Sequence, residues 1–261
     1  MNCDSLARFR KLDFTGQVAL VTGAGAGIGR ACAEGFARSG ANVVVSDIDE
    51  RTGSETATAI RETGGSAVFI PADVSRAADV RTLIAKTVST FGRLDIAHNN
   101  AGISAAAVPM ADVDEQEFDR VIAVNLKSVW LCMKSEIPLM QSLGGGAIVN
   151  TCSALGLVGS SLGTAYVAAK HGVAGLTKTA ALEYSSLGIR VNAVCPGIIR
   201  TQLVKDALSA PEAERQLRAL HPIGRLGEPH DVVGAVLWLA SAAAGFVTGA
   251  LLAVDGGWTA S

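Results

Sequence analysis

Charged side chains are scarce in this sequence, and aromatic side chains are scarcer still. Of its 261 residues, 18% are charged and 5% are aromatic, and the formal net charge is -2. No long run of one charge sign occurs. Proteins that bind nucleic acid need a clustered basic surface, and those that bind single strands add aromatic rings for base stacking. The composition therefore argues against a nucleic-acid-binding function.

Cysteine is also sparse, with five residues spread widely over the chain. The number is odd and no Cys-x-x-Cys spacing occurs, so neither a disulfide framework nor a zinc site is expected. Cys152 has no paired histidine base in the pattern, so we expect a small buried residue rather than a nucleophile. The four histidines show no metal-ligand spacing, and no metal is expected. This cysteine usage favours a reducing cytoplasm.

Signals for export and membrane insertion are lacking as well. The first ten residues have no apolar core after their charges, so they do not form a signal peptide. The stretch between Asp231 and Asp255 carries no charge and is long enough to span a bilayer, but Gly234, Gly245 and Gly249 interrupt it. We interpret it as a buried helix, a loop and a short strand.

Short apolar runs alternate with helix-length segments along the whole chain, which is the pattern of βαβ units and a parallel sheet. Strands are expected at 18–21, 41–45, 66–70, 94–97, 146–150, 190–194 and 250–254. Helices are expected at 27–40, 50–63, 73–91, 114–142, 165–185 and 231–240. Pro138 is expected to kink the last turn of the fourth helix.

No repeat, linker or composition break divides this series. The sequence therefore predicts one domain over 1–261, with a short N-terminal extension over 1–14. Its fold class is α/β, a Rossmann-type doubly wound parallel sheet of seven strands with helices on both faces. Residues 202–227 are polar and are cut by Pro211 and Pro222, so they are expected to form a mobile lid.

A glycine-rich turn follows the first expected strand, with Gly23, Gly27 and Gly29. Glycine lets the backbone turn tightly and approach a pyrophosphate, and the N-terminus of the next helix offers N–H donors. Asp47 ends the second expected strand, at about the distance from Gly29 that a dinucleotide fingerprint has. The turn and the acid together predict a dinucleotide site.

Asp47 also favours NAD over NADP. Its carboxylate can accept hydrogen bonds from both hydroxyls of the adenosine ribose, whereas a 2′-phosphate would place like charges together. No basic residue occurs at 24–26 to neutralise that repulsion. The alternative is that Asp47, or the neighbouring Asp49, only caps the next helix.

Further motifs lie in register with the turn, each after an expected strand. They are Thr22-Gly-x-x-x-Gly27-x-Gly29, Asn99-Asn100-Ala101-Gly102, Ser153, Tyr166-x-x-x-Lys170 and Pro196-Gly197 with Thr201 beyond. Together they resemble the short-chain dehydrogenase/reductase family, of the NAD-preferring alcohol dehydrogenase or ketoreductase type. The resemblance covers the chain from about Gln17 to Trp258.

Tyr166 and Lys170 are four residues apart, so on a helix they share one face. A free tyrosine has a pKa near 10, too high for an efficient base at neutral pH. An ammonium nearby and a positive nicotinamide ring would favour the phenolate and lower that pKa. The phenolate would then take the hydroxyl proton of an alcohol as hydride leaves for the nicotinamide. The alternative is a structural tyrosine beside a snorkelling lysine.

Two more residues complete the catalytic set that we expect: Asn125, Ser153, Tyr166 and Lys170. Ser153 would hydrogen-bond the substrate oxygen, although it could instead cap a loop. The resemblance implies that Asn125 holds a water that links Lys170 to solvent as a proton relay. From the sequence alone, Asn125 could equally be an ordinary polar helix residue.

The resemblance also implies the cofactor contacts. Asp73 and Val74 are expected to border the adenine, Asn100 the adenine-side ribose, and Ile199 and Thr201 the nicotinamide carboxamide. Asp73 could instead cap a helix, and Thr201 could start one. The full expected set is Gly23, Gly27, Ile28, Gly29, Asp47, Ile48, Asp73, Val74, Asn100, Ala101, Gly102, Tyr166, Lys170, Pro196, Gly197, Ile199 and Thr201.

The residues expected to face the substrate are mostly apolar, and no Arg or Lys is placed among them to hold a carboxylate or phosphate. This predicts a neutral, rather hydrophobic secondary alcohol, such as a cyclic or aryl-alkyl alcohol, that is oxidised reversibly to a ketone. The pocket is expected to contain Ser104, Ser153, Ala154, Leu155, Leu157, Tyr166, Ile198 and Leu203.

Two rival functions stay open. An NADPH-dependent 3-oxoacyl-thioester reductase of the same family would prefer a basic residue near 26 or 48, where this chain has Ala26 and Ile48. A non-catalytic dinucleotide sensor or scaffold would not need the catalytic residues. The resemblance further implies a homotetramer, in which the helices over 114–142 and 165–185 pack against a neighbouring copy and the C-terminal strand pairs across a second axis.

Overall fold

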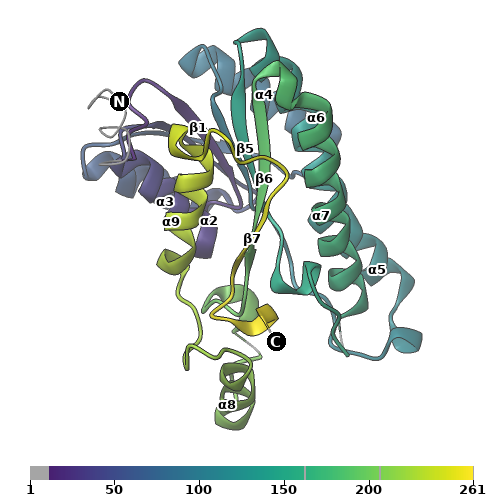
Figure 1. The fold of residues 1–261 in the computed structure, drawn as a ribbon. Coiled ribbons are helices and arrows are strands. Elements are labelled where there is room, and N and C mark those ends of the chain that lie inside the picture. Colours follow the sequence, from purple (N-terminus) through teal and green to yellow (C-terminus); the bar gives the residue numbers. More distant parts are fainter. Residues whose placement is uncertain (1–11, 162, 206, 261) are drawn as a thin grey trace, which may run out of the picture.

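The computed structural model describes residues 12–161, 163–205 and 207–260. Most of the expected N-terminal extension lies outside these ranges. Seven parallel strands form one sheet in the order β3-β2-β1-β4-β5-β6-β7, which confirms the doubly wound Rossmann-type fold (Figure 1). The strands are β1 (Val18–Thr22), β2 (Asn42–Asp47), β3 (Ser66–Pro71), β4 (Ile96–Asn99), β5 (Gly146–Thr151), β6 (Ile189–Pro196) and β7 (Leu251–Val254).

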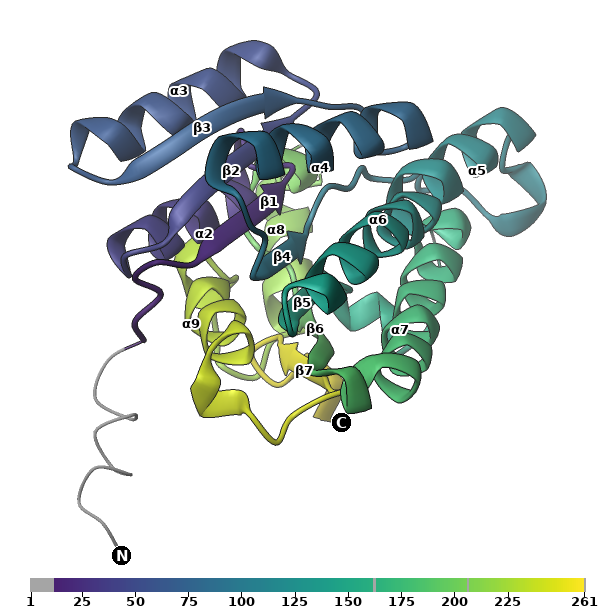
Figure 2. The same cartoon turned by 90° about the horizontal axis from the view of Figure 1, so that it is seen from above.

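Helices cover both faces of the sheet (Figure 2). Alternate residues of a strand point to opposite faces, and here both faces are apolar. Ala19 and Val21 pack with α2, α3 and α9, whereas Val18 and Leu20 pack with α4, α6 and α7. The helices are α2 (Gly27–Arg38), α3 (Glu50–Glu62), α4 (Ala77–Phe91), α5 (Glu115–Ile122), α6 (Ser128–Ser142), α7 (Thr164–Tyr184), α8 (Pro211–Ala219) and α9 (Pro229–Ala240).

The single helix expected over 114–142 is wrong in one respect, because a wide π turn, Ala123–Lys127, separates α5 from α6. Asp114 caps α5, where its side chain accepts hydrogen bonds from the backbone N–H groups of Gln116 and Glu117. Pro138 lies inside α6, and the helix continues beyond it to Ser142. The π turn matters for the site described below.

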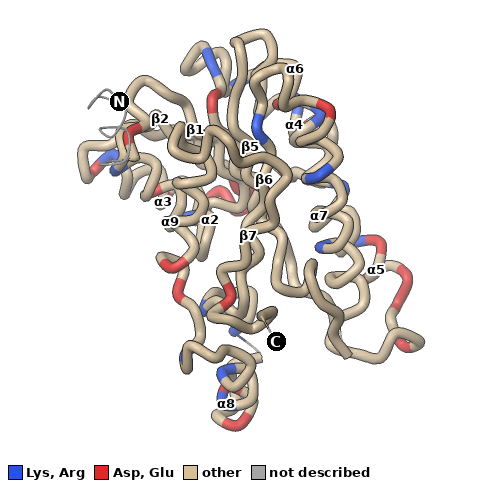
Figure 3. The backbone as a smooth tube through the Cα atoms, viewed as in Figure 1, with Lys and Arg blue, Asp and Glu red and all other residues tan. Residues whose placement is uncertain are grey.

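The uncharged stretch near the C-terminus forms α9, a short connection and the edge strand β7. Within the described ranges, no helix is long and apolar enough to cross a membrane. On the side shown in Figure 3, basic and acidic residues are interspersed over the outer helices and over α8.

The segment expected to be a lid contains a helix of its own. After a short turn at Gln202–Val204, Pro211 begins α8, as proline often does because the first helical N–H needs no partner. In Figure 1, α8 projects beyond the carboxyl end of the sheet. In open α/β sheets, ligands bind at this end, where the chain order reverses between β1 and β4.

Candidate active site

The catalytic residues expected from the sequence meet at the carboxyl end of β5. Ser153 lies two residues after this strand, and Tyr166 and Lys170 occupy the first turns of α7. The Ser153 hydroxyl caps the loop after β5 by accepting a hydrogen bond from the Leu155 N–H at 3.1 Å, and it is near enough to Tyr166 to lower the pKa of that side chain. The Lys170 ammonium lies 5.5 Å from the centroid of the Tyr166 ring, and it donates to the carbonyl oxygen of Thr151 at 2.8 Å. Serine, tyrosine and lysine thus form one cluster.

Burial controls the protonation of this cluster. Burial raises the pKa of Tyr166 to about 12, although the nearby Ser153 side chain opposes the rise. Burial also lowers the pKa of Lys170 to about 8. The expectation that Lys170 and a bound nicotinamide together lower the tyrosine pKa stays a prediction, because this rise in the pKa of Tyr166 applies to the cofactor-free protein. Desolvation of the phenolate is the largest cause of the rise, and Lys170, which donates to the Thr151 carbonyl, is not among its causes.

Asn125 lies in the π turn and is fully buried. Its side chain accepts a hydrogen bond from the Ile103 N–H and donates one to the Ile103 carbonyl, each at 2.8 Å. Both polar groups of the carboxamide are thus used to hold the loop after β4. Single π turns are common at functional sites because they displace backbone carbonyls from regular helical bonding. A relay through a water at Asn125 stays a proposal.

The glycine-rich turn between β1 and α2 is shaped so that only glycine fits at its key positions. A Cβ at Gly29 would lie 2.1 Å from the carbonyl oxygen of Gly23, and one at Gly23 would lie 2.8 Å from the Cα of Ala101. Asn100 braces the turn by donating from its side chain to the carbonyl of Thr22 at 3.0 Å. Gly27, with φ of 55°, adopts the left-handed conformation. This tight turn at a helix N-terminus fits a dinucleotide pyrophosphate.

Asp47 and Asp49 have different roles. The Asp47 carboxylate accepts hydrogen bonds from the N–H of Gly25 at 2.8 Å and from that of Asp49 at 3.0 Å. Asp49, in contrast, caps α3 by accepting from Arg51 and Thr52. The capping alternative for Asp47 is thereby removed, because the neighbour performs it. Asp47 is placed beside the glycine-rich turn, and Ile48 beyond it is 70% exposed.

The remaining cofactor positions surround the same edge of the sheet. Asp73 accepts hydrogen bonds from the backbone and hydroxyl of Ser75, so it shapes the loop before α4 and does not cap that helix. Val74 is buried beside this loop. Thr201 precedes the turn at Gln202–Val204, as the alternative expected, and its methyl group also contacts the position of Gly27.

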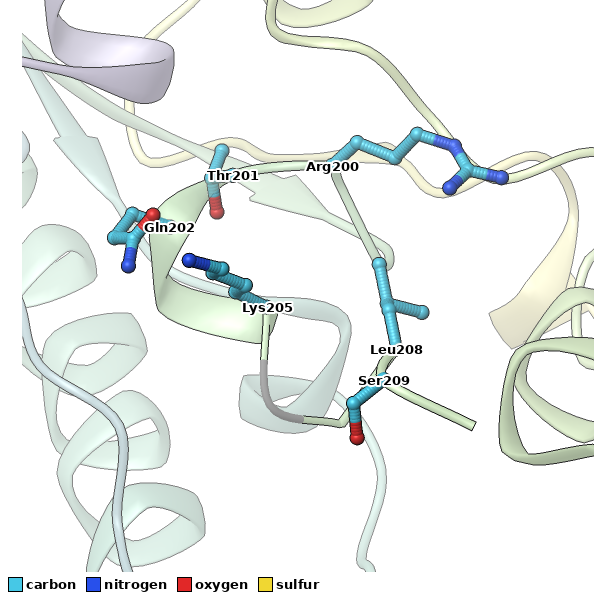
Figure 4. Close-up of a pocket in the computed structure, with 6 residues that line it drawn as sticks. All are labelled: Arg200, Thr201, Gln202, Lys205, Leu208 and Ser209. Carbon is cyan, nitrogen blue, oxygen red and sulfur yellow. The ribbon is translucent and has the colours of Figure 1, made fainter. Parts of the chain in front are cut away.

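A cavity of about 540 Å³ lies beside Thr201, in the segment expected to be a lid (Figure 4). In Figure 4 the side chains of Gln202 and Lys205 point to one side and that of Arg200 to the other. Arg200 is ion-paired with Glu214 and with Glu228. The cavity is lined by Arg200, Thr201, Gln202, Lys205, Leu208 and Ser209.

Two cationic side chains, Arg200 and Lys205, line this cavity, whereas Ser153, Tyr166 and Lys170 do not. Of the expected pocket residues, Ala154 is fully buried, so it presents no open surface. Leu155, Leu157 and Ile198 are partly exposed, and Leu203 is 44% exposed.

The comparisons with known proteins decide the family. Residues 23–259 match a family model described as enoyl-(acyl carrier protein) reductase. The chain is 45% identical to 2,5-dichloro-2,5-cyclohexadiene-1,4-diol dehydrogenase of Sphingobium indicum, over 95% of this chain and 99% of the relative. The chain belongs to the short-chain dehydrogenase/reductase family.

Other relatives in the family act on ring alcohols according to their names. The chain is 45% identical to cyclohexanol dehydrogenase of an Acinetobacter strain, over 94% of this chain and 96% of the relative. It is 44% identical to cis-4-hydroxycyclohexanecarboxylate dehydrogenase of Sinomonas cyclohexanicum, over 95% and 98%. The crystal structure of levodione reductase matches with a TM-score of 0.92 at 36% identity, over 95% of this chain and 99% of that one. The relatives are dehydrogenases of secondary alcohols, cyclic diols and hydroxy acids, which supports oxidoreductase activity with a nicotinamide dinucleotide.

His221 anchors the loop after β6, and the sequence did not single it out for this role. It is buried, its Nε2 accepts a hydrogen bond from the Ile198 N–H at 3.0 Å, and its Nδ1 donates to the Leu217 carbonyl at 3.0 Å. It therefore joins the end of α8 to the loop after β6. An isolated histidine in a polar segment carries no signal for this role, because the contact joins residues far apart in the chain.

Cys152 is buried, as expected, and its thiol donates to the carbonyl of Lys170 at 3.2 Å. Among the described residues, Cys32, Cys132, Cys152 and Cys195 are free thiols.

Proposed function

We propose that this protein is an NAD(H)-dependent dehydrogenase that oxidises a secondary alcohol, of the ring-alcohol class, reversibly to a ketone. The observation that carries the proposal is the Ser153, Tyr166 and Lys170 cluster at the carboxyl end of β5, in which the Lys170 ammonium lies 5.5 Å from the centroid of the Tyr166 ring. This cluster offers an acid/base group, a group that orients the substrate oxygen and a cation in one place. A non-catalytic dinucleotide sensor would not need it.

Each residue of this cluster has a separate role in the proposed reaction. Ser153 holds the substrate oxygen, and the Tyr166 oxygen accepts the hydroxyl proton during oxidation or returns it during reduction. Bound at the glycine-rich turn, NAD would supply the hydride acceptor and a positive ring. Because burial holds the tyrosine neutral in the cofactor-free protein, we infer that the phenolate is favoured only when that positive charge is present. Lys170, directed to Thr151, holds its ammonium beside the tyrosine.

The reaction is tested by mixing the purified protein with a panel of secondary alcohols and either NAD or NADP, and following the absorbance of the reduced cofactor. We expect turnover of ring alcohols such as cyclohexanol with NAD. Turnover only with NADPH and 3-oxoacyl thioesters would favour the rival reductase. Cofactor binding without turnover of any substrate would favour the sensor.

The preference for NAD rests on Asp47. Its carboxylate lies beside the glycine-rich turn, held by the Gly25 N–H, where a 2′-phosphate would be repelled. We expect Asp47→Ala to lower kcat/KM for NAD at least tenfold and to raise the relative use of NADP. Asp49→Ala is the matched control, since it removes a helix cap but not the ribose contact. An NAD-to-NADP ratio that is the same in wild type and Asp47→Ala would refute the assignment.

The cavity beside Thr201 favours a second candidate substrate class, a ring alcohol that carries a carboxylate. Lys205 lines this cavity, and no ion pair to it occurs within residues 12–161, 163–205 and 207–260. The neighbouring Arg200, in contrast, is occupied by Glu214 and Glu228. An ammonium without an acidic partner can pair with an anionic substituent of the substrate.

We expect Lys205→Met to lower kcat/KM for 4-hydroxycyclohexanecarboxylate at least fivefold and to leave kcat/KM for cyclohexanol within twofold. The measurement compares the two substrates in wild type and variant at low and high salt, because added salt screens the ion pair. Cyclohexanol is the internal control. If wild type rejects the carboxylate, or if both substrates change equally, the neutral-alcohol assignment holds.

We propose a homotetramer on two surfaces. Trp130 on α6 and Leu182 on α7 are 43% and 87% exposed, and α5, α6 and α7 form an outer layer of the fold (Figure 2). Trp238 and Phe246, near the edge strand β7, are 37% and 105% exposed. Large exposed apolar side chains on two faces support burial against further copies.

Leu182→Glu is expected to convert the tetramer into dimers, since it places a charge in the helical interface. Light scattering coupled to size-exclusion chromatography measures the mass. Met110→Glu is the control, because Met110 is 75% exposed but lies in the short 3₁₀ turn Met110–Asp112 before α5, away from α6 and α7. A wild-type protein that stays monomeric at micromolar concentration would overturn the proposed assembly.

The proposed compartment is a reducing cytoplasm. The free thiols of the four described cysteines support it, because oxidising compartments pair cysteines in disulfides.

A further inference from the structure

A buried acid lies beneath the active site and takes no part in the reaction proposed above. Glu136, on α6, is fully buried. Its Oε2 accepts a hydrogen bond from the Asn99 side-chain amide at 3.0 Å. The same amide donates to the Asn150 side chain at 3.1 Å, and Asn150 donates to the Thr177 hydroxyl at 3.0 Å. This chain of side chains, which we call the core polar network, joins α6, β4, β5 and α7.

Two oxygen atoms of the core polar network have no hydrogen-bond donor. They are Oε1 of Glu136 and Oδ1 of Asn99, both buried in the part of the chain that the structure describes. They belong to the two side chains that the 3.0 Å hydrogen bond already joins. An ionised carboxylate can only accept, so it would leave both oxygens without a partner. Each buried acceptor without a donor destabilises the folded protein, because it has lost its hydrogen bonds to water and gained none.

A protonated carboxyl group removes both deficits at once, because it has one O–H donor. If Oε1 carries the proton, it can donate to Oδ1 of Asn99 while Oε2 accepts from the amide. We propose that Glu136 is a neutral carboxylic acid that donates from Oε1 to Oδ1 of Asn99, and that this acid–amide pair makes Glu136 a positioning residue for the active site. The acid acts through Asn99 and Asn150, not on the substrate.

The strand ends that this pair holds carry parts of the site. Asn100 follows Asn99 and braces the glycine-rich turn. Thr151 follows Asn150, and its carbonyl accepts the hydrogen bond from Lys170. The acid–amide pair thus fixes the ends of β4 and β5, to which the cofactor turn and the catalytic lysine are attached.

The surroundings of Glu136 favour the neutral form. Burial raises its pKa to about 7, and the Asn99 hydrogen bond only partly offsets the rise. Cys132, one turn earlier on α6, has a pKa raised by burial and stays a thiol. His98 on β4 is neutral because burial lowers its pKa to about 3, and it points to the opposite face of the strand from Asn99.

The other elements packed against α6 bring no cation to this point. β5 and α7 contribute Asn150 and Thr177 to the core polar network. The buried side chains of α4 are Val80, Leu83 and Thr87, and β6 contributes apolar side chains and Cys195. Within the described residues, no cation is among the causes of the Glu136 shift.

The stabilisation of the fold by the protonated acid–amide pair depends on pH. The folded-state pKa is raised above the ordinary value of 4.5, so the protonated pair stabilises the fold fully below that value. The contribution is lost as the pH rises through about 7, because the unfolded chain releases the proton that the folded protein retains. A neutral isostere of Glu136 keeps this stabilising contribution as the pH rises, because it has no proton to release.

Glu136→Gln is that isostere, because its amide can accept from Asn99 through Oε1 and donate to it through Nε2. We expect wild type and Glu136→Gln to have unfolding equilibrium constants within about twofold at pH 5. At pH 8.5 the variant should be at least tenfold more resistant to unfolding, which is about 1.4 kcal/mol. Denaturant titrations of the assembled protein at several pH values measure this. Glu183→Gln, an exposed site on α7, removes the same charge and should show no pH-dependent difference.

The positioning role is tested by Glu136→Leu, which removes both hydrogen bonds. We expect KM for NAD to rise at least fivefold in this variant and to return close to the wild-type value in Glu136→Gln. This readout separates positioning from simple stabilisation, because both variants are compared at a temperature at which each is folded. Equal KM values in all three proteins would overturn the positioning role.

Infrared spectroscopy of the wild type tests the protonation directly, whether or not the variants fold. With isotopically labelled glutamate at pH 6, the C=O stretch of a protonated carboxyl group should appear, and it should vanish in Glu136→Gln or at high pH. Absence of that band in the folded wild type, or a stability difference between wild type and Glu136→Gln that is the same at every pH, would show that Glu136 is ionised. These readouts do not depend on the substrate of the enzyme.

Discussion

Tyr166→Phe is expected to reduce kcat at least a thousandfold and to leave NAD binding nearly unchanged. The phenyl ring keeps the packing above Lys170 and removes only the oxygen that exchanges the proton. A thousandfold loss corresponds to about 4 kcal/mol of transition-state stabilisation, at the upper side of what general acid–base catalysis supplies. Steady-state kinetics with cyclohexanol, and NAD binding by fluorescence, measure the two effects.

Tyr184→Phe is the matched control, because the chain has only two tyrosines and Tyr184 lies at the far end of α7. In the wild type, kcat/KM for oxidation should rise with pH as the phenolate forms, and Tyr166→Phe should lack this rise. Without cofactor, ultraviolet titration should show that Tyr166 ionises above free tyrosine, because burial raises its pKa to about 12. A Tyr166→Phe enzyme within tenfold of wild type would place the base elsewhere.

Lys170→Ala is expected to lose at least a hundredfold in kcat and, unlike Tyr166→Phe, to weaken NAD binding as well. The lysine is buried, and its ammonium is held by the Thr151 carbonyl at 2.8 Å, beside the tyrosine ring. Its removal deletes the cation nearest to the phenolate and the donor that we expect to bind the nicotinamide ribose. Kinetics and cofactor titration measure both losses.

Lys178→Ala controls for this change, since Lys178 is an exposed residue two turns further along α7. It should leave kcat and NAD binding within twofold of wild type. If Lys170→Ala lowers kcat but leaves NAD binding as in wild type, the lysine acts on the tyrosine alone and the ribose contact is withdrawn.

Local spacing explains why so much of the site could be predicted. Tyr166 and Lys170 share a helix face because four residues make about one turn. Glycine is needed where one stretch of backbone passes close to another. A Cβ on Gly23 would collide with the backbone of Ala101, and a Cβ on Gly29 would collide with the backbone of Gly23. The spacing of these glycines can be recognised from neighbouring residues, although the close contact of Gly23 with Ala101 joins distant parts of the chain.

Protonation could not be predicted in the same way. The sequence predicts that a lysine and a bound nicotinamide together lower the pKa of Tyr166, whereas in the cofactor-free structure burial raises that pKa. Desolvation depends on everything that packs around a group, and most of that comes from elsewhere in the chain. Glu136 shows the same limit, because its partner Asn99 lies on a different element.

The sequence alone therefore determined the order of strands and helices along the chain and the glycine-rich turn, and it predicted the cofactor acid Asp47 and the catalytic residues, because each depends on periodicity or on short spacings. The tertiary structure alone decided the π turn that places Asn125, the cavity with Lys205, the anchoring by His221 and the pKa of every buried group. These features arise where segments far apart in the chain pack together and exclude water. A local sequence pattern does not show which distant segments will pack together.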